Sequence, residues 1–161
     1  MNERVIQTEL VVEAPPSECF RVWTTEEGVR SFFAPDCRVE LREDGPYEMY
    51  FLLENAPGLR GGEGNTVLAF QEPSMFSFSW NHPPHLDQIR NQRTHVTLRF
   101  HALEGNRTRF TFRQDGWGEG GQWDEGFAYF ERAWLQLVLP KFCDLFARAG
   151  AEDPDPGCCD D

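Results

Sequence analysis

Hydrophobic and polar residues follow a strand pattern at the start of the chain and then a helical one. Residues 5–13 are rich in β-branched side chains and predict a strand that ends at the following Ala-Pro-Pro. A stripe of apolar residues then predicts a helix, in which Pro16 can take an early position. Thr24 and Glu27 have the spacing of a capping box, and they predict a second short helix that reaches about Phe32.

From residue 37 onward the period of the pattern changes to two, which is typical of strands with one buried face. The alternation is clearest in residues 94–102 and 108–114, where Leu98 shares a face with Phe110 and Phe112. Loops rich in Gly and Pro separate the strands. After the two helices the pattern predicts six strands, at residues 37–42, 47–53, 66–71, 75–80, 94–102 and 108–114.

The C-terminal part of the chain carries the longest helical signal, over residues 123–149. Large apolar residues recur there at steps of three or four and lie on one helical face. Pro140 predicts a kink, because a proline removes the hydrogen bond to the carbonyl of Gln136. Residues 151–161 are acidic and contain Pro and Gly, which predicts a disordered tail.

This order of elements predicts an α+β fold. A helix this long must cover one face of the sheet, and a wide twisted sheet curls around it. We therefore predict one domain over residues 1–150, in which a curved antiparallel sheet wraps around the long C-terminal helix and leaves space between them. With 161 residues the chain is long enough for one real core.

The charge balance narrows the range of partners. Fifteen Lys and Arg against 27 Asp and Glu give a net charge of −12, which repels phosphate backbones and anionic lipid. We predict no nucleic-acid partner. No stretch has the roughly 20 apolar residues of a membrane span, so no membrane partner is predicted either. The N-terminal residues lack an apolar signal core, which predicts a cytoplasmic protein with reduced cysteines.

Several short motifs follow one another along the chain in a characteristic order. They are Glu13-Ala14-Pro15-Pro16, Phe20 to Trp23, Phe32-Phe33-Ala34-Pro35, Gly45-Pro46-Tyr47-Glu48, Phe78-Ser79-Trp80, Gly116-Trp117 and Ala133-Trp134. Together, over about residues 4–149, they resemble the family related to the C-terminal domain of the Hsp90 ATPase activator, within the START-like, Bet v 1-like (SRPBCC) superfamily. The resemblance implies a helix-grip fold with a cavity, but no single activity, since this superfamily hosts ligand carriers, cyclases and chaperone regulators.

Aromatic side chains form the strongest candidate site. The chain has 14 Phe and 5 Trp, which either pack an ordinary core or line a pocket. With the resemblance we expect a pocket of about 300–1,000 Å³ between the sheet and the C-terminal helix. Gln114 and Tyr47 would orient a ligand there, unless Gln114 faces water at its strand end. The predicted ligand-binding residues are Tyr47, Met49, Phe51, Phe76, Phe78, Trp80, Leu98, Phe110, Phe112, Gln114, Phe127, Phe130 and Trp134.

Two pairs of residues suggest metal chemistry without completing a site. His82 and His85 have a spacing that some metal sites use, but no Cys or carboxylate pair completes a tetrahedral set, so we favour a loop turn. Cys158 and Cys159 lie in the tail, where a ligand site would lack preorganisation and a disulfide between neighbours would be strained. We predict no metal and no cofactor.

Charged residues on the strands suggest two further sites. Glu48 and Asp115 could serve as a buried acid or base, although a surface position is the reading we favour, and no catalytic residue is predicted. A basic stripe on the outer sheet face could receive an acidic partner, or it could be a solvated face balanced by acids. Its members are His95, Arg99, His101, Arg109 and Arg113.

Three functions remain open from the sequence. The preferred hypothesis is binding of a small hydrophobic or aromatic molecule in the pocket. The alternative is a chaperone-regulating domain, which contacts Hsp90 through the outer sheet face or through residues 81–93. The third is a cyclase- or hydrolase-like enzyme that uses the same pocket.

Overall fold

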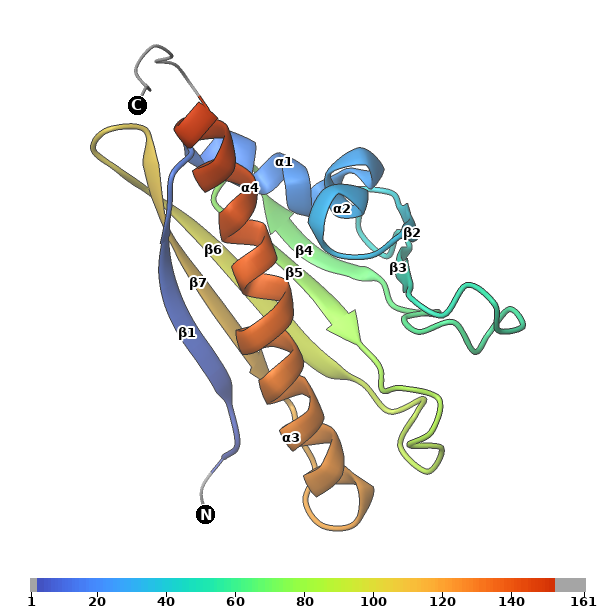
Figure 1. Ribbon diagram of the computed structural model, residues 1–161. Coiled ribbons are helices and arrows are strands. Elements are labelled where there is room, and N and C mark those ends of the chain that lie inside the picture. The colour runs from blue at the N-terminus through green and yellow to red at the C-terminus, as the bar shows by residue number, and fades with distance from the viewer. Residues whose placement is uncertain (1–2, 153–161) are drawn as a thin grey trace.

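The computed structural model describes residues 3–152, in which a long C-terminal helix lies across one face of a five-stranded antiparallel sheet (Figure 1). The strand order is β1-β7-β6-β5-β4. Two short helices follow the first strand, so the predicted α+β helix-grip fold is confirmed. The sheet comprises β1 (Ile6–Val12), β4 (Val67–Gln71), β5 (Met75–Trp80), β6 (Thr94–Leu103) and β7 (Arg107–Asp115).

The two short helices are α1 (Pro16–Thr24) and α2 (Glu26–Phe32), and α1 begins at the predicted proline. The cap of α2 is Thr25, not the predicted Thr24. The hydroxyl of Thr25 accepts the N–H of Gly28 at 3.1 Å, whereas Thr24 donates to a carbonyl within α1. Thr24 is still helical, and only Thr25 has the extended backbone that an N-cap requires.

A separate hairpin consists of β2 (Asp36–Val39) and β3 (Tyr47–Tyr50). Both strands are shorter than the pattern predicts. After β3 the backbone N–H groups of Phe51 and Leu52 donate to the carbonyl of Arg60, at 2.8 and 2.9 Å. The chain therefore leaves the hairpin as a loop folded on itself, although its apolar residues continue the strand pattern.

The inner face of the large sheet has the predicted parity. Phe76 lies opposite Leu98, and Leu98 lies opposite Phe112, with all three side chains fully buried. His95 and His101 point to the other side and are exposed, as their strand positions predict. The sheet thus has an aromatic inner face and a polar outer face.

The C-terminal helix is continuous but contains one widened turn. It consists of α3 (Gln122–Ala133), a π turn (Trp134–Val138) and α4 (Leu139–Glu152). In the π turn the N–H of Leu139 donates to the carbonyl of Trp134, five residues back. Pro140 has no N–H to donate, and the ladder adjusts to this loss by a π turn directly before it.

The core is built around Trp23 of α1. Its ring centroid lies 4.9 Å from that of Phe32, 5.4 Å from that of Phe142 and 5.8 Å from that of Phe110. Helices and sheet therefore meet on this one side chain. The predicted disordered tail lies outside the described residues from Asp153 onward, and so do Cys158 and Cys159.

Candidate functional site

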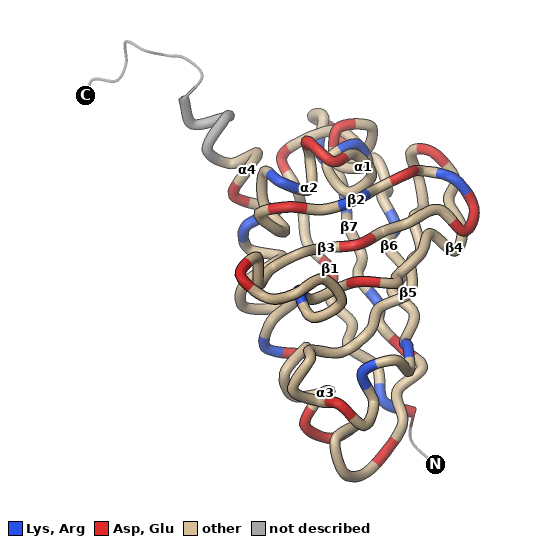
Figure 2. The backbone as a smooth tube through the Cα atoms, turned by 90° about the vertical axis from the view of Figure 1, so that its right-hand side faces the viewer, with Lys and Arg blue, Asp and Glu red and all other residues tan. Residues whose placement is uncertain are grey.

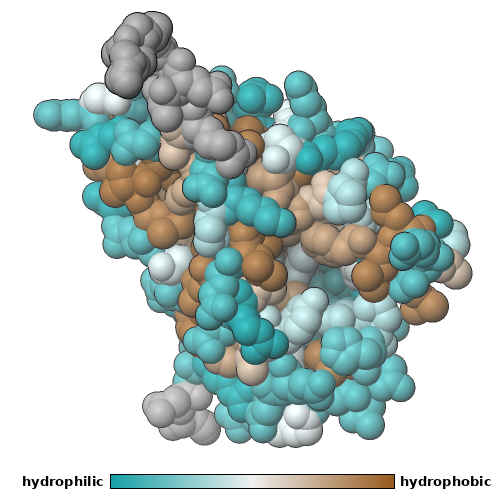
Figure 3. Space-filling model, viewed as in Figure 1, coloured by the Kyte–Doolittle hydropathy of each residue, from teal (hydrophilic) through white to brown (hydrophobic). Residues whose placement is uncertain are grey.

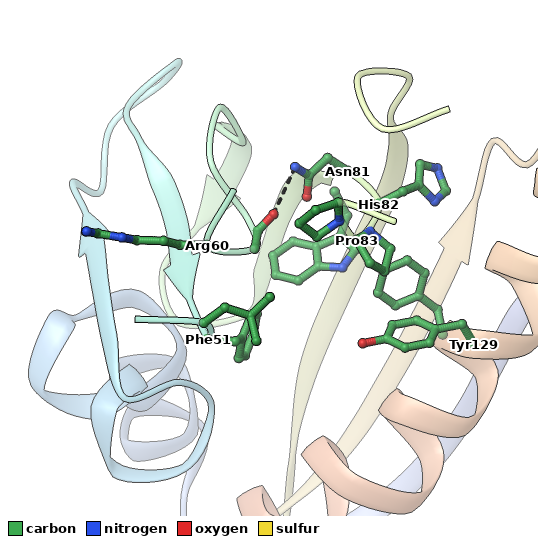
Figure 4. Close-up of a pocket in the computed structure, with 11 residues that line it drawn as sticks. Phe51, Arg60, Asn81, His82, Pro83 and Tyr129 are labelled. Atoms are coloured by element: carbon green, nitrogen blue, oxygen red, sulfur yellow. Dashed lines mark hydrogen bonds between the residues drawn. The ribbon is translucent and has the colours of Figure 1, made fainter. Parts of the chain in front are cut away.

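A cavity of about 110 Å³ opens at one end of the inner sheet face. Three segments surround it: the end of β5 with the chain that follows, the helix α3, and the loop after β3 (Figure 4). Most of the wall is apolar. The side chains that give it this character are Phe51, Leu52, Trp80, Pro83, Tyr129 and Phe130.

The polar side chains around this cavity differ in where they point and what they bind. The side-chain nitrogen of Asn81 donates to the carbonyl of Gly61 at 3.1 Å, which connects the two loop walls (Figure 4). The side chain of Arg60 extends away from the opening, whereas the hydroxyl of Tyr129 points across it toward Phe51. Tyr129 thus offers one hydroxyl beside a mainly apolar wall.

The structure divides the predicted ligand-binding residues between the cavity and the core. Phe51, Trp80 and Phe130 line the cavity. Phe127 is half-buried, with its ring centroid 5.1 Å from that of Trp117. The remaining residues are buried in the core at 0 or 1% exposure, and they are Tyr47, Met49, Phe76, Phe78, Leu98, Phe110, Phe112, Gln114 and Trp134.

The space that the sequence leaves open between sheet and helix is occupied largely by α1. Trp23 packs against the inner strands, and Phe20 lies 6.2 Å from Phe76 and 5.7 Å from Phe100 between ring centroids. The sequence shows the apolar stripe of α1, but it does not show which surface of the sheet that stripe covers. The aromatic cavity therefore lies at the end of the sheet, and a second hollow of about 170 Å³ lies between β1 and the C-terminal helix, where Leu10 faces Leu135 and Leu139.

Both predicted polar groups are inside the protein and away from the cavity lining. The hydroxyl of Tyr47 donates to the carbonyl of Trp23 at 2.6 Å, and burial raises its pKa well above the usual value. Gln114 is fully buried and does not face water. Its amide nitrogen donates to the hydroxyl of Thr94 at 2.9 Å. These groups hold α1, β6 and β7 in place.

The two histidines of the β5–β6 connection have different environments. His82 is 1% exposed, and its ring points away from the cavity, with its centroid 5.0 Å from that of Trp123. Burial, together with the nearby Arg90, lowers its pKa to about 4. His85 is exposed, 3.8 Å from Glu125. Within residues 3–152 no group of three potential metal ligands comes together.

The two candidate acids bind other protein groups. The carboxylate of Glu48 accepts the hydroxyl of Tyr50 and the N–H of Gly64. Asp115 lies 3.1 Å from Arg113 and 3.5 Å from His95. Neither carboxylate lines the cavity, so their positions do not favour the enzyme hypothesis.

The outer sheet face carries the predicted basic stripe, partly balanced by acids. Arg109 lies 3.1 Å from Glu9, and Arg113 lies 3.1 Å from Asp115. Among the described residues no acid lies within ion-pair distance of Arg99. In the part of the chain that the structure describes, basic and acidic residues are interspersed rather than separated into blocks (Figure 2).

The rim of the cavity exposes apolar side chains. Phe51 is 38% exposed, and Leu52, Leu53 and Leu59 of the same loop are exposed as well, with Tyr129 facing them from α3. Figure 3 shows hydrophobic residues gathered over this loop, beside a hollow between the loop and the C-terminal helix. A ligand would enter past this rim.

The fold and the sequence match one known family. Residues 13–142 match the family described as Activator of Hsp90 ATPase homolog 1-like protein. The chain belongs to this family. The resemblance that its motifs suggest is thereby confirmed, and the family fits either a chaperone activator or a ligand-binding helix-grip protein.

Solved structures with the fold of this Activator of Hsp90 ATPase homolog 1-like chain come from several organisms. An HSP90 activator from Plasmodium falciparum has a TM-score of 0.67 at 15% identity, covering 89% of this chain and 96% of that one. The Aha1 dimer from Colwellia psychrerythraea gives 0.67 at 16%, covering 89% and 96%. A Mesorhizobium loti protein gives 0.69 at 15%, covering 94% and 100%.

No curated protein matches the sequence of this family member. Within residues 3–152, none of its helices combines the length and the apolar character needed to cross a bilayer.

Proposed function

We propose that the protein binds a small aromatic or hydrophobic molecule, about one ring in size, in the cavity beside Trp80. The observation that carries this proposal is the aromatic wall around a volume of about 110 Å³. An apolar cavity of about 150 Å³ can hold benzene, whereas pockets for drug-sized ligands span about 300–1,000 Å³. The proposed ligand is therefore smaller than the sequence alone suggests.

The state of the walls also supports this proposal. Trp80 and Phe130 are 3% and 7% exposed, so they are held in place before a ligand arrives. Preorganised walls reduce the entropic cost of binding. The hydroxyl of Tyr129 supplies a polar contact at the opening. A neutral phenol combines a ring for the wall with an oxygen for Tyr129.

Fluorine NMR with 4-fluorophenol tests this function. We expect the protein to broaden and shift the probe signal, with a Kd on the order of 0.1–1 mM for so few ligand atoms. Leu52→Trp places a larger ring at the mouth and should weaken binding about tenfold. Leu59→Trp is the matched control, because Leu59 is exposed on the same loop but does not line the cavity.

The control variant distinguishes binding in the cavity from non-specific binding to the exposed loop. If the wild-type protein leaves the probe signal unchanged at millimolar concentrations, the proposed function is wrong. Equal weakening by Leu52→Trp and Leu59→Trp would place the probe elsewhere on the exposed loop.

A second candidate function is regulation of an Hsp90-type chaperone. The family match over residues 13–142 favours it, and so does the similarity in fold to an HSP90 activator from Plasmodium falciparum. The outer sheet face offers a surface for this role, because Arg99 has no ion-pair partner among the described residues. An acidic patch on the partner protein would form an ion pair with Arg99.

Binding to purified Hsp90 by calorimetry tests this candidate. The double variant Arg99→Glu, Arg109→Glu should weaken the complex at least about tenfold, and added salt should reduce that difference. Arg38→Glu, Arg42→Glu makes the same charge change on the β2–β3 hairpin and serves as the control. Unchanged affinity of the first variant in a demonstrated complex would exclude the outer face as the contact.

A further inference from the structure

One buried arginine ties together the two loop segments that wall the cavity. Arg90 lies on the connection between β5 and β6 and is 8% exposed. Its Nη1 donates to the carbonyl of Gly61 at 2.8 Å and also to the carbonyl of His82. Gly61 belongs to the loop after β3, and His82 belongs to the chain after β5; both line the cavity. This nitrogen therefore joins the two segments, beside the neutral hydrogen bond from the side chain of Asn81 to the same carbonyl of Gly61.

The other end of the same guanidinium holds a carboxylate that organises the loop. Nη2 of Arg90 donates to the carbonyl of Gly58 at 2.7 Å and to Glu63 at 3.2 Å. The carboxylate of Glu63 accepts the N–H groups of Gly58 at 2.8 Å, Arg60 at 2.9 Å and Gly61 at 2.9 Å. The loop is thus folded around Glu63, and Arg90 closes the arrangement from the opposite segment.

This ion pair differs in burial from the others in the described part of the chain. The side chains of Arg90 and Glu63 are 10% and 19% exposed, whereas those of Arg109 and Glu9 are 42% and 58% exposed. Removing one member of a buried pair leaves the other charged and without its partner. Burial raises the pKa of Glu63, but backbone N–H groups outweigh it, and the net pKa lies below its ordinary value.

A neighbouring arginine joins the same two segments at a point away from the cavity. Arg93 donates to Asn65 at 3.0 Å and to the carbonyl of Glu63 at 3.2 Å. It does not line the cavity, and its hydrogen bonds do not include the carbonyl of His82. Loss of Arg93 should loosen the loop at Glu63 and Asn65, beyond the cavity, and leave the bonds from Arg90 to Gly61 and His82 in place.

We propose that the Arg90–Glu63 pair is a positioning element that sets the width of the cavity and thereby limits its ligand to one ring. The inference rests on the proposed ligand-binding function. Without the pair, the neutral hydrogen bonds from Asn81 to Gly61 and Glu63 remain as the link beside the cavity. The loop that carries Phe51 and Gly61 can then move farther from the segment after β5, and the cavity admits a longer ring system.

Two fluorinated phenols of different size measure this width. In fluorine NMR the wild-type protein should bind 4-fluorophenol more tightly than 6-fluoro-2-naphthol. Arg90→Gln should shift the ratio of the two Kd values at least about tenfold in favour of the naphthol. Glu63→Gln should shift it in the same direction, and the matched control Arg93→Gln should keep the wild-type ratio.

Amide hydrogen exchange gives a readout that needs no ligand. In Arg90→Gln the N–H groups of Gly58, Arg60 and Gly61 should exchange faster, while those of β6 and β7 keep their wild-type rates. If Arg90→Gln does not fold, Arg90→Lys is used, because a single ammonium cannot reach all three carbonyls and the carboxylate together.

The outcomes separate this inference from the function on which it rests. A Kd ratio unchanged within twofold in Arg90→Gln overturns the positioning role, and so does an equal shift in Arg93→Gln. If the wild-type protein binds neither phenol, the proposed function fails. Hydrogen exchange then decides the positioning role: unchanged rates at Gly61 in Arg90→Gln overturn it, and faster rates there but not in Arg93→Gln support it.

Discussion

At the scale of single residues, His82 combines full burial with two ring nitrogens that have no hydrogen-bond partner among the described residues. Its ring packs against Trp117, Trp123 and Phe130. Protonation would place a charge among these rings, close to Arg90. Burial first, and then the nearby arginines, lower the pKa to about 4, so His82 is neutral at physiological pH.

This shift predicts a loss of stability in mild acid. In the unfolded chain His82 titrates near its ordinary pKa of about 6.5. Below that pH the unfolded state binds a proton that the folded state does not bind until about pH 4, so acid favours unfolding. The contribution is fully present above about pH 6.5, and about 2 kcal/mol of it should be lost by pH 5.

Urea unfolding at pH 7.5 and pH 5 measures this loss. His82→Phe should remove most of the difference in unfolding free energy between the two pH values. His101→Gln, at an exposed position, should leave it as in the wild type. A pH dependence that persists in His82→Phe would mean that another group causes it.

At the scale of elements, the corner between α1 and α2 sets where the largest core side chain lies. A Cβ on Gly28 would lie 2.3 Å from the Cα of Val22, so the backbones of the two helices touch there. This contact places Trp23 against Phe33, with 5.4 Å between their ring centroids. Phe33 in turn stacks on Trp80 at the cavity, 5.7 Å away. The corner therefore supports the cavity wall.

A methyl group at this contact should force the two helices apart. Gly28→Ala should lower the free energy of unfolding by about 1–3 kcal/mol, the usual cost of overpacking. Glu27→Ala, at the exposed neighbouring position, is the control. Urea denaturation of both variants checks this, and equal stability of Gly28→Ala and the wild type would contradict the close contact.

The same scale shows which features the sequence can reveal. Periodicity is local, so it predicts the inner face of β5, β6 and β7 and the start of α1 at Pro16. Periodicity makes the predicted strand β3 too long. The loop after it is closed by backbone hydrogen bonds to the carbonyl of Arg60, and such bonds leave no periodic pattern in the sequence. Three residues of the cavity, Phe51, Trp80 and Phe130, follow from parity and helical spacing.

The rest of the site depends on contacts between distant segments. Arg90 and Glu63 lie 27 positions apart, in two loops whose charged residues resemble any solvated surface in the sequence. The filling of the interior by Trp23 is hidden for the same reason. Its helical stripe shows that it is buried, but not what it is buried against.

At the scale of the whole molecule, charge and shape together favour a neutral ligand. The net charge of −12 repels anions, whereas the described cavity is walled mainly by rings and opens through an apolar rim. A carboxylate-bearing aromatic would lose hydration there without gaining a cationic partner, because Arg60 points away and Arg90 is bound to Glu63. These features favour a small uncharged ring as the ligand of the proposed site.

A crystal of the protein soaked in 4-iodophenol tests this central claim most directly. The anomalous signal of iodine locates the bound ring without assumptions about its pose. The account predicts one strong iodine peak in the cavity between Phe51, Trp80 and Phe130. Iodine only at other positions, with this cavity free of it at a concentration that saturates the protein in solution, would contradict the account.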